Sequence, residues 1–214
     1  MMEIPQESMK KIPNRITVSR ILLIFIFVIL ANFDGGADPN PNCILVNEKF
    51  AYVCHWIAYI LAIIAGLTDF IDGHLARKYH VESDFGRLID PLADKIFVLA
   101  TYIMMVDYRL VPGWILIVML AREFLVTGLR TLASGKGIVI AADKFGKIKT
   151  TLQMIALFIG GASWLHIGGL DVTEQGSWIF VAWYILLILV ALVTLFSGLS
   201  YFIRYRKLYF DSNL

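Results

Sequence analysis

Long apolar segments alternate with short polar ones along almost the whole chain. Six of these segments are long enough to cross a bilayer as helices, which takes roughly 20 residues at ~1.5 Å rise per residue. They cover approximately residues 16–33, 50–68, 88–108, 110–133, 148–166 and 177–203. The first and third carry charged residues at their ends, so hydropathy supports these two less than the others. The pattern predicts an all-α, polytopic membrane protein with six transmembrane helices.

The charges between the apolar segments support the same count. Lysine and arginine are concentrated in the N-terminal segment, in the loops 73–87 and 134–147 and in the C-terminal tail. The loops 34–49, 107–112 and 167–176 carry one cation or none. Cytoplasmic loops of membrane proteins hold an excess of Lys and Arg. Because rich and poor loops alternate without a break, we expect both termini in the cytoplasm.

The composition changes this picture little. Hydrophobic residues make up 58% of the 214 residues and charged residues 17%, against about 45–50% and about 25% in soluble domains. A net charge of +2 gives no reason to expect nucleic acid as a partner. No internal repeat or low-complexity tract interrupts the chain, so we expect one membrane domain over residues 1–214.

Two further features lie near the first apolar segment. The stretch "IPQESMKKIPN" is predicted to lie on the membrane surface before the first span. A cleaved signal peptide is the alternative, but no small-residue cleavage site follows the apolar run.

Cys43 and Cys54 both fall near the outer face in this topology. A disulfide between them is conceivable, but two unpaired thiols are favoured because two cysteines specify little.

Four aspartates lie where apolar segments meet the cytoplasmic loop 73–87. Asp69 and Asp72 are spaced i, i+3, and Asp90 and Asp94 are spaced i, i+4, so each pair shares a helix face. The two pairs should lie at similar depth, because one helix leaves the membrane where the next one enters. Four ionised carboxylates there would repel one another and would be costly beside hydrocarbon. Divalent cations would offset that cost.

The types of side chain in this cluster narrow the choice of metal. All candidate donors are oxygens, and His74 and His80 fall off the aspartate face. Such a site suits Mg²⁺, Mn²⁺ or Ca²⁺ rather than zinc. Magnesium usually takes one or two carboxylates, so four aspartates suit two ions, Mg²⁺ or Mn²⁺, that share a phosphate-bearing substrate. The alternative, that the charges only cap helix ends, is preferred for Glu82 and Asp84.

Small residues next to these aspartates leave room for a ligand. Gly73 and Ala76 follow Asp72, and Gly86 precedes Asp90 by one helical turn. A glycine inside a helix costs roughly 1 kcal/mol relative to alanine, so close approach of a ligand is a reasonable cause. Arg77 lies about one turn from Asp72, where its side chain could contact a phosphate or an aspartate.

The stretch "DFIDGHLARKYHVESDFGRLIDPLAD" resembles the signature of the CDP-alcohol phosphotransferases, Asp-x2-Asp-Gly-x2-Ala-Arg-x8-Gly-x3-Asp-x3-Asp. Every fixed position of the signature is met, by Asp69, Asp72, Gly73, Ala76, Arg77, Gly86, Asp90 and Asp94. The resemblance implies that an alcohol attacks the β-phosphorus of a CDP-linked lipid and that CMP leaves. The absence of a recognisable Ser-His or Cys-His pair in the sequence agrees with direct displacement.

The resemblance also implies roles for single residues. Asp69, Asp72 and Asp90 would hold the metal ions, and Asp94 would act as general base and as a further metal ligand. The residues expected to border the CDP group are Asp69, Gly73, Ala76, Arg77 and Gly86. The family further suggests a homodimer.

Basic residues in the fourth and fifth apolar segments point to the acceptor alcohol. Arg122, Arg130, Lys147 and Lys149 lie in "AREFLVTGLR" and "KFGKIKTTLQ" and could gather at the cytoplasmic side. Such a group suits an acceptor that carries a phosphate. Arg130, Lys136 and Lys144 could instead enforce topology or bind anionic lipids, which we prefer for the two lysines. For Arg122 the alternative is a structural ion pair with a carboxylate.

The stretches "PNRITVSRILL", "AREFLVTGLR" and "GKIKTTLQ" resemble bacterial phosphatidylglycerophosphate synthases, so that the likeness runs from Pro13 to about Gln153. It implies CDP-diacylglycerol as donor and sn-glycerol 3-phosphate as acceptor, at the cytoplasmic face of a bacterial cell membrane. Asn14, Thr17 and Arg20, three residues apart, would join the headgroup site. Cardiolipin or phosphatidylinositol phosphate synthesis remains an alternative. Cation transport is another, although it predicts acidic residues spread across the bilayer.

Overall fold

The computed structural model describes the backbone of residues 6–36, 43–79, 84–138, 140 and 144–206. Side chains are described for residues 19–36, 43–66, 92–93, 95–138, 140 and 145–206. The chain divides into two compact units, residues 1–108 and 109–214. Each unit is built from helices that pack along their length, and each is described by itself.

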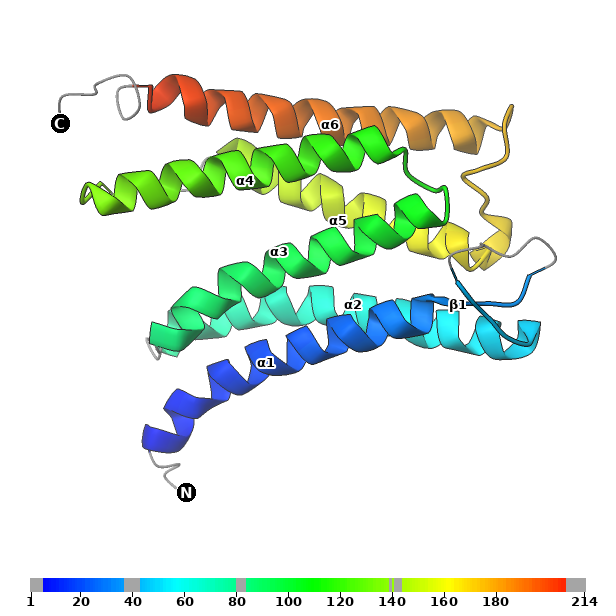
Figure 1. Cartoon of the computed structure of the whole chain (residues 1–214), viewed down its shortest axis with the longest axis horizontal. Coiled ribbons are helices and arrows are strands. Elements are labelled where there is room, and N and C mark those ends of the chain that lie inside the picture. Colours follow the sequence, from blue (N-terminus) through cyan, green and yellow to red (C-terminus); the bar gives the residue numbers. More distant parts are fainter. Residues whose placement is uncertain (1–5, 37–42, 80–83, 139, 141–143, 207–214) are drawn as a thin grey trace. The chain divides into compact units, whose positions relative to one another are not determined.

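The first unit holds three helices and one short strand pair (Figure 1). These are α1 (Gln6–Ala31), β1 (Phe33–Asp34), β2 (Ile44–Leu45), α2 (Glu48–Tyr79) and α3 (Asp84–Asp107). Helix α1 packs against both α2 and α3. The strands pair in parallel, with Phe33 opposite Ile44, inside the loop expected at the outer face. Gly35 is needed there, because a Cβ atom on it would lie 2.6 Å from the carbonyl oxygen of Val46.

Small side chains let the helices of the first unit approach closely. The buried residues along α2 are Ala51, Cys54, Ala58, Ala62 and Ala65, at intervals of three or four residues. Stripes of small residues are typical of packed helices in membranes, where close backbone contact supplies much of the attraction. Cys54 belongs to this stripe as a free thiol, and Cys43 is also free. The expectation of two unpaired cysteines is therefore confirmed.

The second unit consists of α4 (Gly113–Gly135), α5 (Lys144–Trp164), the 3-10 turn η1 (Ile167–Gly169) and α6 (Trp178–Arg204). Helix α6 packs against both α4 and α5 (Figure 1). Its buried face consists of Trp183, Leu187, Val190, Ala191, Thr194, Ser197 and Tyr201, again at helical spacing. The hydroxyl of Ser177 caps the helix by accepting a hydrogen bond from the backbone N–H of Ile179.

Each predicted apolar span coincides with a helix of the described chain, and several of these helices extend beyond the predicted span. The loop expected at 73–87 contains helix on both sides, since α2 continues to Tyr79 and α3 begins at Asp84. Leu75, Ala76, Arg77 and Lys78 are good helix formers, so the helix continues past the apolar segment. Residues 6–14 of the expected surface segment form the start of α1.

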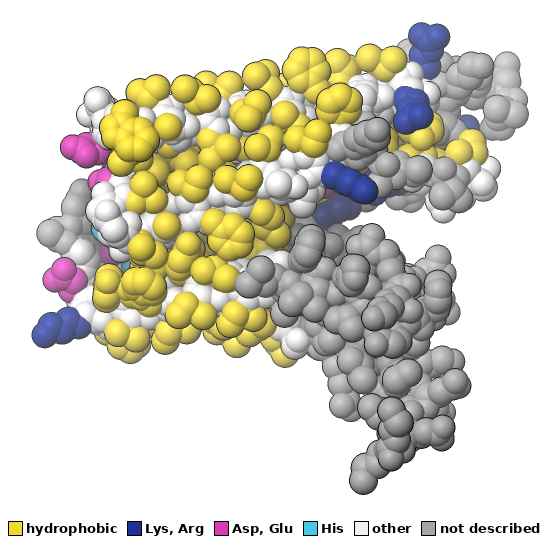
Figure 2. All heavy atoms as spheres, turned by 180° about the vertical axis from the view of Figure 1, so that it is seen from behind, with side chains coloured by type: hydrophobic (Ala, Val, Ile, Leu, Met, Phe, Trp, Pro, Cys, Tyr) yellow, Lys and Arg dark blue, Asp and Glu magenta, His cyan; other side chains and the backbone are white. Residues whose placement is uncertain are grey.

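The described helices differ in how well they fit a bilayer by length and hydropathy. Two segments are long and apolar enough to cross a membrane, Glu48–Gly66 of α2 and Trp178–Arg204 of α6. Ser19–Ala31 of α1 is a shorter apolar helix. In Figure 2, hydrophobic side chains cover the visible sides of the described helices, and charged side chains gather near their ends. The mostly helical fold agrees with the all-α prediction.

A hydrogen bond between α6 and the turn before α4 provides a test of how these two segments pack together. The indole N–H of Trp183 donates a buried hydrogen bond of 2.8 Å to the carbonyl oxygen of Leu110. Trp183→Phe should lower the free energy of unfolding by about 1–3 kcal/mol, because a buried acceptor loses its donor. Thermal unfolding in detergent micelles measures this. Trp178→Phe is the matched control, since Trp178 is 78% exposed on the same helix. Equal melting temperatures for the two variants would contradict the role of the bond.

Candidate functional site

The aspartates of the signature lie on two consecutive helices of the first unit. Asp72 lies seven residues before the last residue of α2, and Asp90 lies six residues after the first residue of α3. At ~1.5 Å per residue, both are roughly 10 Å along their helices from the connection between them. Asp69 and Asp94 are each ten residues from that connection, or roughly 15 Å. The helix positions therefore agree with two aspartate pairs at similar depth.

The side chains of these aspartates lie outside the described residues. The same is true of Gly73, Ala76, Arg77 and Gly86 and of Asn14 and Thr17 in α1. Among the residues whose side chains are described, no group of three or more His, Cys, Asp or Glu residues could hold a metal ion. That search does not include the four aspartates, so the predicted metal site stays a prediction. Arg20 of α1 is described, and it is buried with 4% of its surface exposed.

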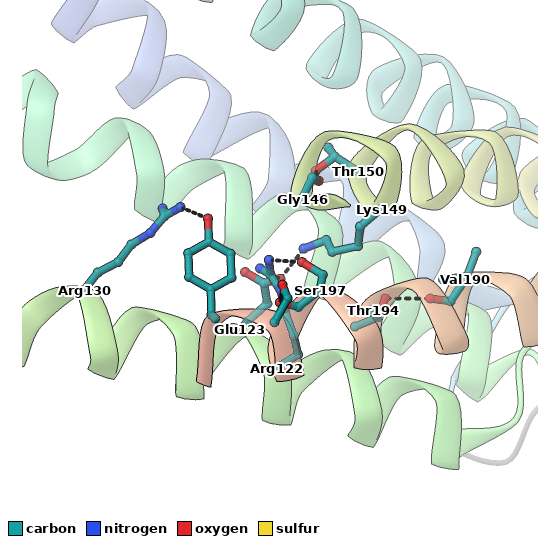
Figure 3. A network of polar contacts seen from close by, with 11 residues as sticks. Arg122, Glu123, Arg130, Gly146, Lys149, Thr150, Val190, Thr194 and Ser197 are labelled. Atoms are coloured by element: carbon teal, nitrogen blue, oxygen red, sulfur yellow. Dashed lines mark hydrogen bonds and ion pairs between the residues drawn. The ribbon is translucent and has the colours of Figure 1, made fainter. Parts of the chain in front are cut away.

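A buried ion-pair network is described in the second unit (Figure 3). One carboxylate oxygen of Glu123 in α4 lies 3.1 Å from Nη1 of Arg122 and also forms an ion pair with Nζ of Lys149 in α5. All three side chains are at least four-fifths buried. The carboxylate lets two cations lie close together in an apolar surrounding, where either alone would be costly. The ion pair considered for Arg122 from the sequence is therefore present, and Lys149 shares it.

Helix α6 supplies a second contact to Arg122. Its Nη2 atom donates a hydrogen bond of 2.7 Å to the hydroxyl of Ser197. The side chain of Arg122 is 10% exposed. Its Nε atom is buried, and none of the described residues accepts a hydrogen bond from it. A buried guanidinium whose Nε–H has no acceptor among the described residues can accommodate a further acceptor, such as a phosphate oxygen.

The ring of Tyr201 lies beside both arginines of α4. The guanidinium carbon of Arg122 is 5.8 Å from the ring centroid, and that of Arg130 is 5.6 Å from it. Nη2 of Arg130 also donates a hydrogen bond of 3.0 Å to the tyrosine hydroxyl. Both distances are in the range of a cation–π attraction. The two arginines, two helical turns apart on α4, are thus linked through one aromatic residue of α6.

The structure brings together three of the four basic residues expected at the acceptor site. Arg122 and Lys149 share Glu123, and Arg130 joins Arg122 through Tyr201. Lys147 instead lies exposed on α5, two residues and about 200° around the helix from Lys149. Counting only the side chains that the structure describes, three cations share one carboxylate, so this part of the cluster carries more positive than negative charge. A phosphate monoester, at about −1.5 to −2 near pH 7, complements that excess.

The sequence pattern did not identify three members of this cluster as site residues: Glu123, Ser197 and Tyr201. Glu123 was visible as an acid beside Arg122 in an apolar helix, which is a signal for a partnered charge. Ser197 and Tyr201 lie in the most apolar helix of the chain, where a single serine or tyrosine carries no functional signal of its own. Only their position next to α4 assigns them a role.

Comparisons with known proteins bear on both parts of the chain. The model of the CDP-alcohol phosphatidyltransferase family matches residues 10–197. A Bacillus subtilis protein is 46% identical over 70% of this chain and 75% of its own length. A Rickettsia typhi protein is 33% identical over 94% of this chain and 100% of its own length. A Mycoplasma pneumoniae protein is 32% identical over 94% of this chain and 88% of its own length.

All three relatives carry the name CDP-diacylglycerol–glycerol-3-phosphate 3-phosphatidyltransferase. The family match includes the complete aspartate signature, residues 69–94, and continues to Ser197 in α6. The prediction made from the signature is confirmed: the chain belongs to the CDP-alcohol phosphatidyltransferase family.

Proposed function

We propose that this chain transfers the phosphatidyl group of CDP-diacylglycerol to sn-glycerol 3-phosphate, giving phosphatidylglycerophosphate and CMP. The observation that carries the proposal is the complete aspartate signature in a chain whose full-length relatives have this activity in their names. It is a metal-dependent transferase of anionic phospholipid synthesis. Membership of a transferase family removes the reason for the cation-transport alternative.

The first unit provides the donor half of the reaction. Asp69, Asp72, Asp90 and Asp94 form an all-oxygen donor set at matched positions on α2 and α3, which fits two Mg²⁺ or Mn²⁺ ions. Such ions, when bound, polarise the phosphorus and stabilise the CMP leaving group. Together with Asp69, the residues assigned to the CDP group are Gly73, Ala76, Arg77 and Gly86. The small side chains among them leave room for the nucleotide, and Arg77 offsets phosphate charge.

Asp94 takes the proton in this reaction. A free hydroxyl of glycerol 3-phosphate attacks the phosphorus that carries diacylglycerol, and the bond from this phosphorus to the CMP oxygen breaks. The carboxylate of Asp94 accepts the hydroxyl proton as the new bond forms. No covalent enzyme intermediate is needed, because the acceptor displaces CMP directly.

The second unit provides the acceptor half. Arg122, Arg130 and Lys149 bind the phosphate of glycerol 3-phosphate, supported by their excess positive charge and by the buried Nε–H of Arg122. A planar guanidinium suits two phosphate oxygens better than an ammonium does. Asn14, Thr17 and Arg20 remain proposed members of the headgroup site, whereas Lys147, exposed on another face of α5 than Lys149, is left out of it.

The same proposal includes the membrane arrangement. The six helices cross a bacterial cytoplasmic membrane as one domain, with both termini and the reaction at the cytoplasmic face, as the alternation of basic loops predicts. The protein acts as a homodimer. The exposed apolar residues of α6, among them Ile185, Leu192 and Phe196, support contact of this helix with lipid or with a second copy.

A direct assay of acceptor choice tests the function. Purified protein in mixed micelles with CDP-diacylglycerol should release CMP with glycerol 3-phosphate, and not with inositol phosphate, serine or phosphatidylglycerol. Release with phosphatidylglycerol would instead identify a cardiolipin synthase. Release with inositol phosphate would identify a phosphatidylinositol phosphate synthase. Either result would overturn the acceptor while leaving the family unchanged.

Removal of divalent metal should abolish the activity. EDTA should stop CMP release, and Mg²⁺ or Mn²⁺ should restore it, because oxygen-only ligands bind hard cations. Asp69→Asn, Asp72→Asn and Asp90→Asn should each lower turnover by orders of magnitude, and Asp94→Asn by roughly 10²- to 10⁴-fold through loss of the base. Asp84→Asn is the matched control, since Asp84 begins α3 at a variable position of the signature and should keep near wild-type turnover. Full activity after exhaustive chelation would rule out the metal role.

Acceptor and donor use should respond to different arginines. Arg122→Ala should lower kcat/KM for glycerol 3-phosphate by roughly 10- to 100-fold, since a charge-assisted contact contributes about 1.5–3 kcal/mol. Arg77→Ala should act mainly on CDP-diacylglycerol. Arg122→Lys should recover only part of the loss, because a point charge cannot replace the planar fork. Saturation curves for each substrate, with the other in excess, measure both effects.

Lys136→Ala is the control for the acceptor measurement, because Lys136 is an exposed residue just after the end of α4. It should change neither curve. Elution of each variant from a sizing column as wild type does excludes misfolding. An unchanged glycerol 3-phosphate curve for Arg122→Ala would refute the phosphate role of this arginine.

The topology predicts that Cys43 faces the outside of the cell. A membrane-impermeant maleimide should therefore label Cys43 in intact cells, with Cys43→Ala as the control. Burial raises the pKa of the Cys43 thiol, and the thiolate is the reacting species. Labelling should thus be slow near pH 7 and should accelerate as the pH rises toward 9. Protection of Cys43 at every pH until the cells are lysed would contradict the six-span arrangement.

A further inference from the structure

Three contacts within a short stretch of α6 reach the arginines of α4. They come from Ser197, Gly198 and Tyr201, called here the α6 contact residues. None of the three carries a charge, and none belongs to the aspartate signature. Ser197 is fully buried and Tyr201 is 3% exposed. Their common feature is contact with Arg122 or Arg130, as Figure 3 shows for Ser197 and Arg122.

Ser197 and Gly198 together fit the side chain of Arg122. The serine hydroxyl accepts the 2.7 Å hydrogen bond from Nη2 of Arg122. The aliphatic part of the same arginine lies against Gly198, where an added Cβ atom would be 3.0 Å from its Cγ atom. That distance is tighter than ordinary van der Waals contact. A larger residue at this position would press on Arg122, so the glycine leaves the space that the aliphatic part of Arg122 occupies.

Tyr201 fixes the second arginine relative to the first. Its ring packs on Val126 and Leu129, which lie between Arg122 and Arg130 on α4. The guanidinium carbons are 5.8 and 5.6 Å from the ring centroid, and the hydroxyl accepts from Arg130. Two like charges held near each other repel, and the electron-rich ring offsets part of this repulsion.

The neutrality of these contacts matters for the proposed phosphate site. A carboxylate such as Glu123 holds a cation by cancelling its charge. A hydroxyl and an aromatic ring bring no opposite charge, so the contacts from α6 add nothing to the neutralisation that Arg122 already receives from Glu123. An arginine side chain loses rotamer freedom when it is ordered. If that ordering precedes binding, the substrate does not have to supply it.

We propose that Ser197, Gly198 and Tyr201 are positioning residues, which hold Arg122 and Arg130 at a set spacing for the acceptor's phosphate without touching the substrate themselves. This inference rests on the proposed function, since it assigns the two arginines to glycerol 3-phosphate. It adds α6 to the acceptor site, through residues that act only by way of α4.

Kinetic variants of α6 test the proposal. Tyr201→Phe keeps the ring and removes the hydroxyl that accepts from Arg130, so kcat/KM for glycerol 3-phosphate should fall roughly 3- to 10-fold, in the range of the net contribution of one hydrogen bond. Ser197→Ala and Gly198→Ala should act in the same direction, and the KM for CDP-diacylglycerol should stay unchanged. Thr194→Val is the matched control, because this buried hydroxyl bonds to the carbonyl oxygen of Val190 in its own helix. It should change neither KM.

A double-mutant cycle separates positioning from a general structural role. In an Arg130→Ala background, Tyr201→Phe should have no further effect on acceptor kcat/KM, and in an Arg122→Ala background Ser197→Ala should have none. A merely structural role would lower acceptor and donor use together and would persist in both backgrounds. Either of those results would overturn the proposal.

The single variants distinguish this inference from the function on which it rests. If Arg122→Ala weakens acceptor use and Tyr201→Phe, Ser197→Ala and Gly198→Ala do not, the arginine site stands and the positioning role is wrong. If Arg122→Ala and Arg130→Ala both leave the glycerol 3-phosphate curve unchanged, the acceptor site itself is wrong, and the role of α6 with it.

Discussion

A charged side chain in an apolar helix needs a partner, because an ion beside hydrocarbon costs several kcal/mol when nothing compensates it. This constraint accounts for the buried ion-pair network of the second unit. Glu123 compensates Arg122 and Lys149, and in doing so links α4 to α5. From α6, Tyr201 and Ser197 add neutral hydrogen-bond acceptors for the arginines. The polar contacts thus join all three helices of the second unit at one level.

Small residues make those polar contacts reachable. Gly198 leaves the space in which Arg122 lies, and in the first unit the alanines along α2 let α1 and α3 approach. Helices that pack through small residues gain close backbone contact but contribute few side-chain atoms. Long arginine and lysine side chains then fill the remaining space with their aliphatic parts while their charged ends meet partners. Packing and charge compensation are therefore coupled in this fold.

In the proposed reaction, the two units have different tasks. The donor half needs an all-oxygen metal site. Aspartates spaced three or four residues apart on two helices can supply its ligands. The acceptor half needs positive charge that is held in place but not cancelled. One carboxylate shared by two cations, together with neutral contacts from α6, meets that need. The acceptor site consequently depends on three helices, whereas the aspartate signature occupies two helices joined by a short connection.

The sequence by itself determined the apolar segments, the aspartate signature with its family, and the basic residues of α4 and α5. Each of these is local, because helix periodicity and ligand type can be read within one or two turns. The tertiary structure alone decided that Lys149 rather than Lys147 joins the cluster, and that α2 and α3 extend through most of the expected loop. It also revealed Ser197 and Tyr201, whose partners on α4 are 75 and 71 residues away. Periodicity gives the direction of a side chain around its own helix, but not which distant helix packs against that side.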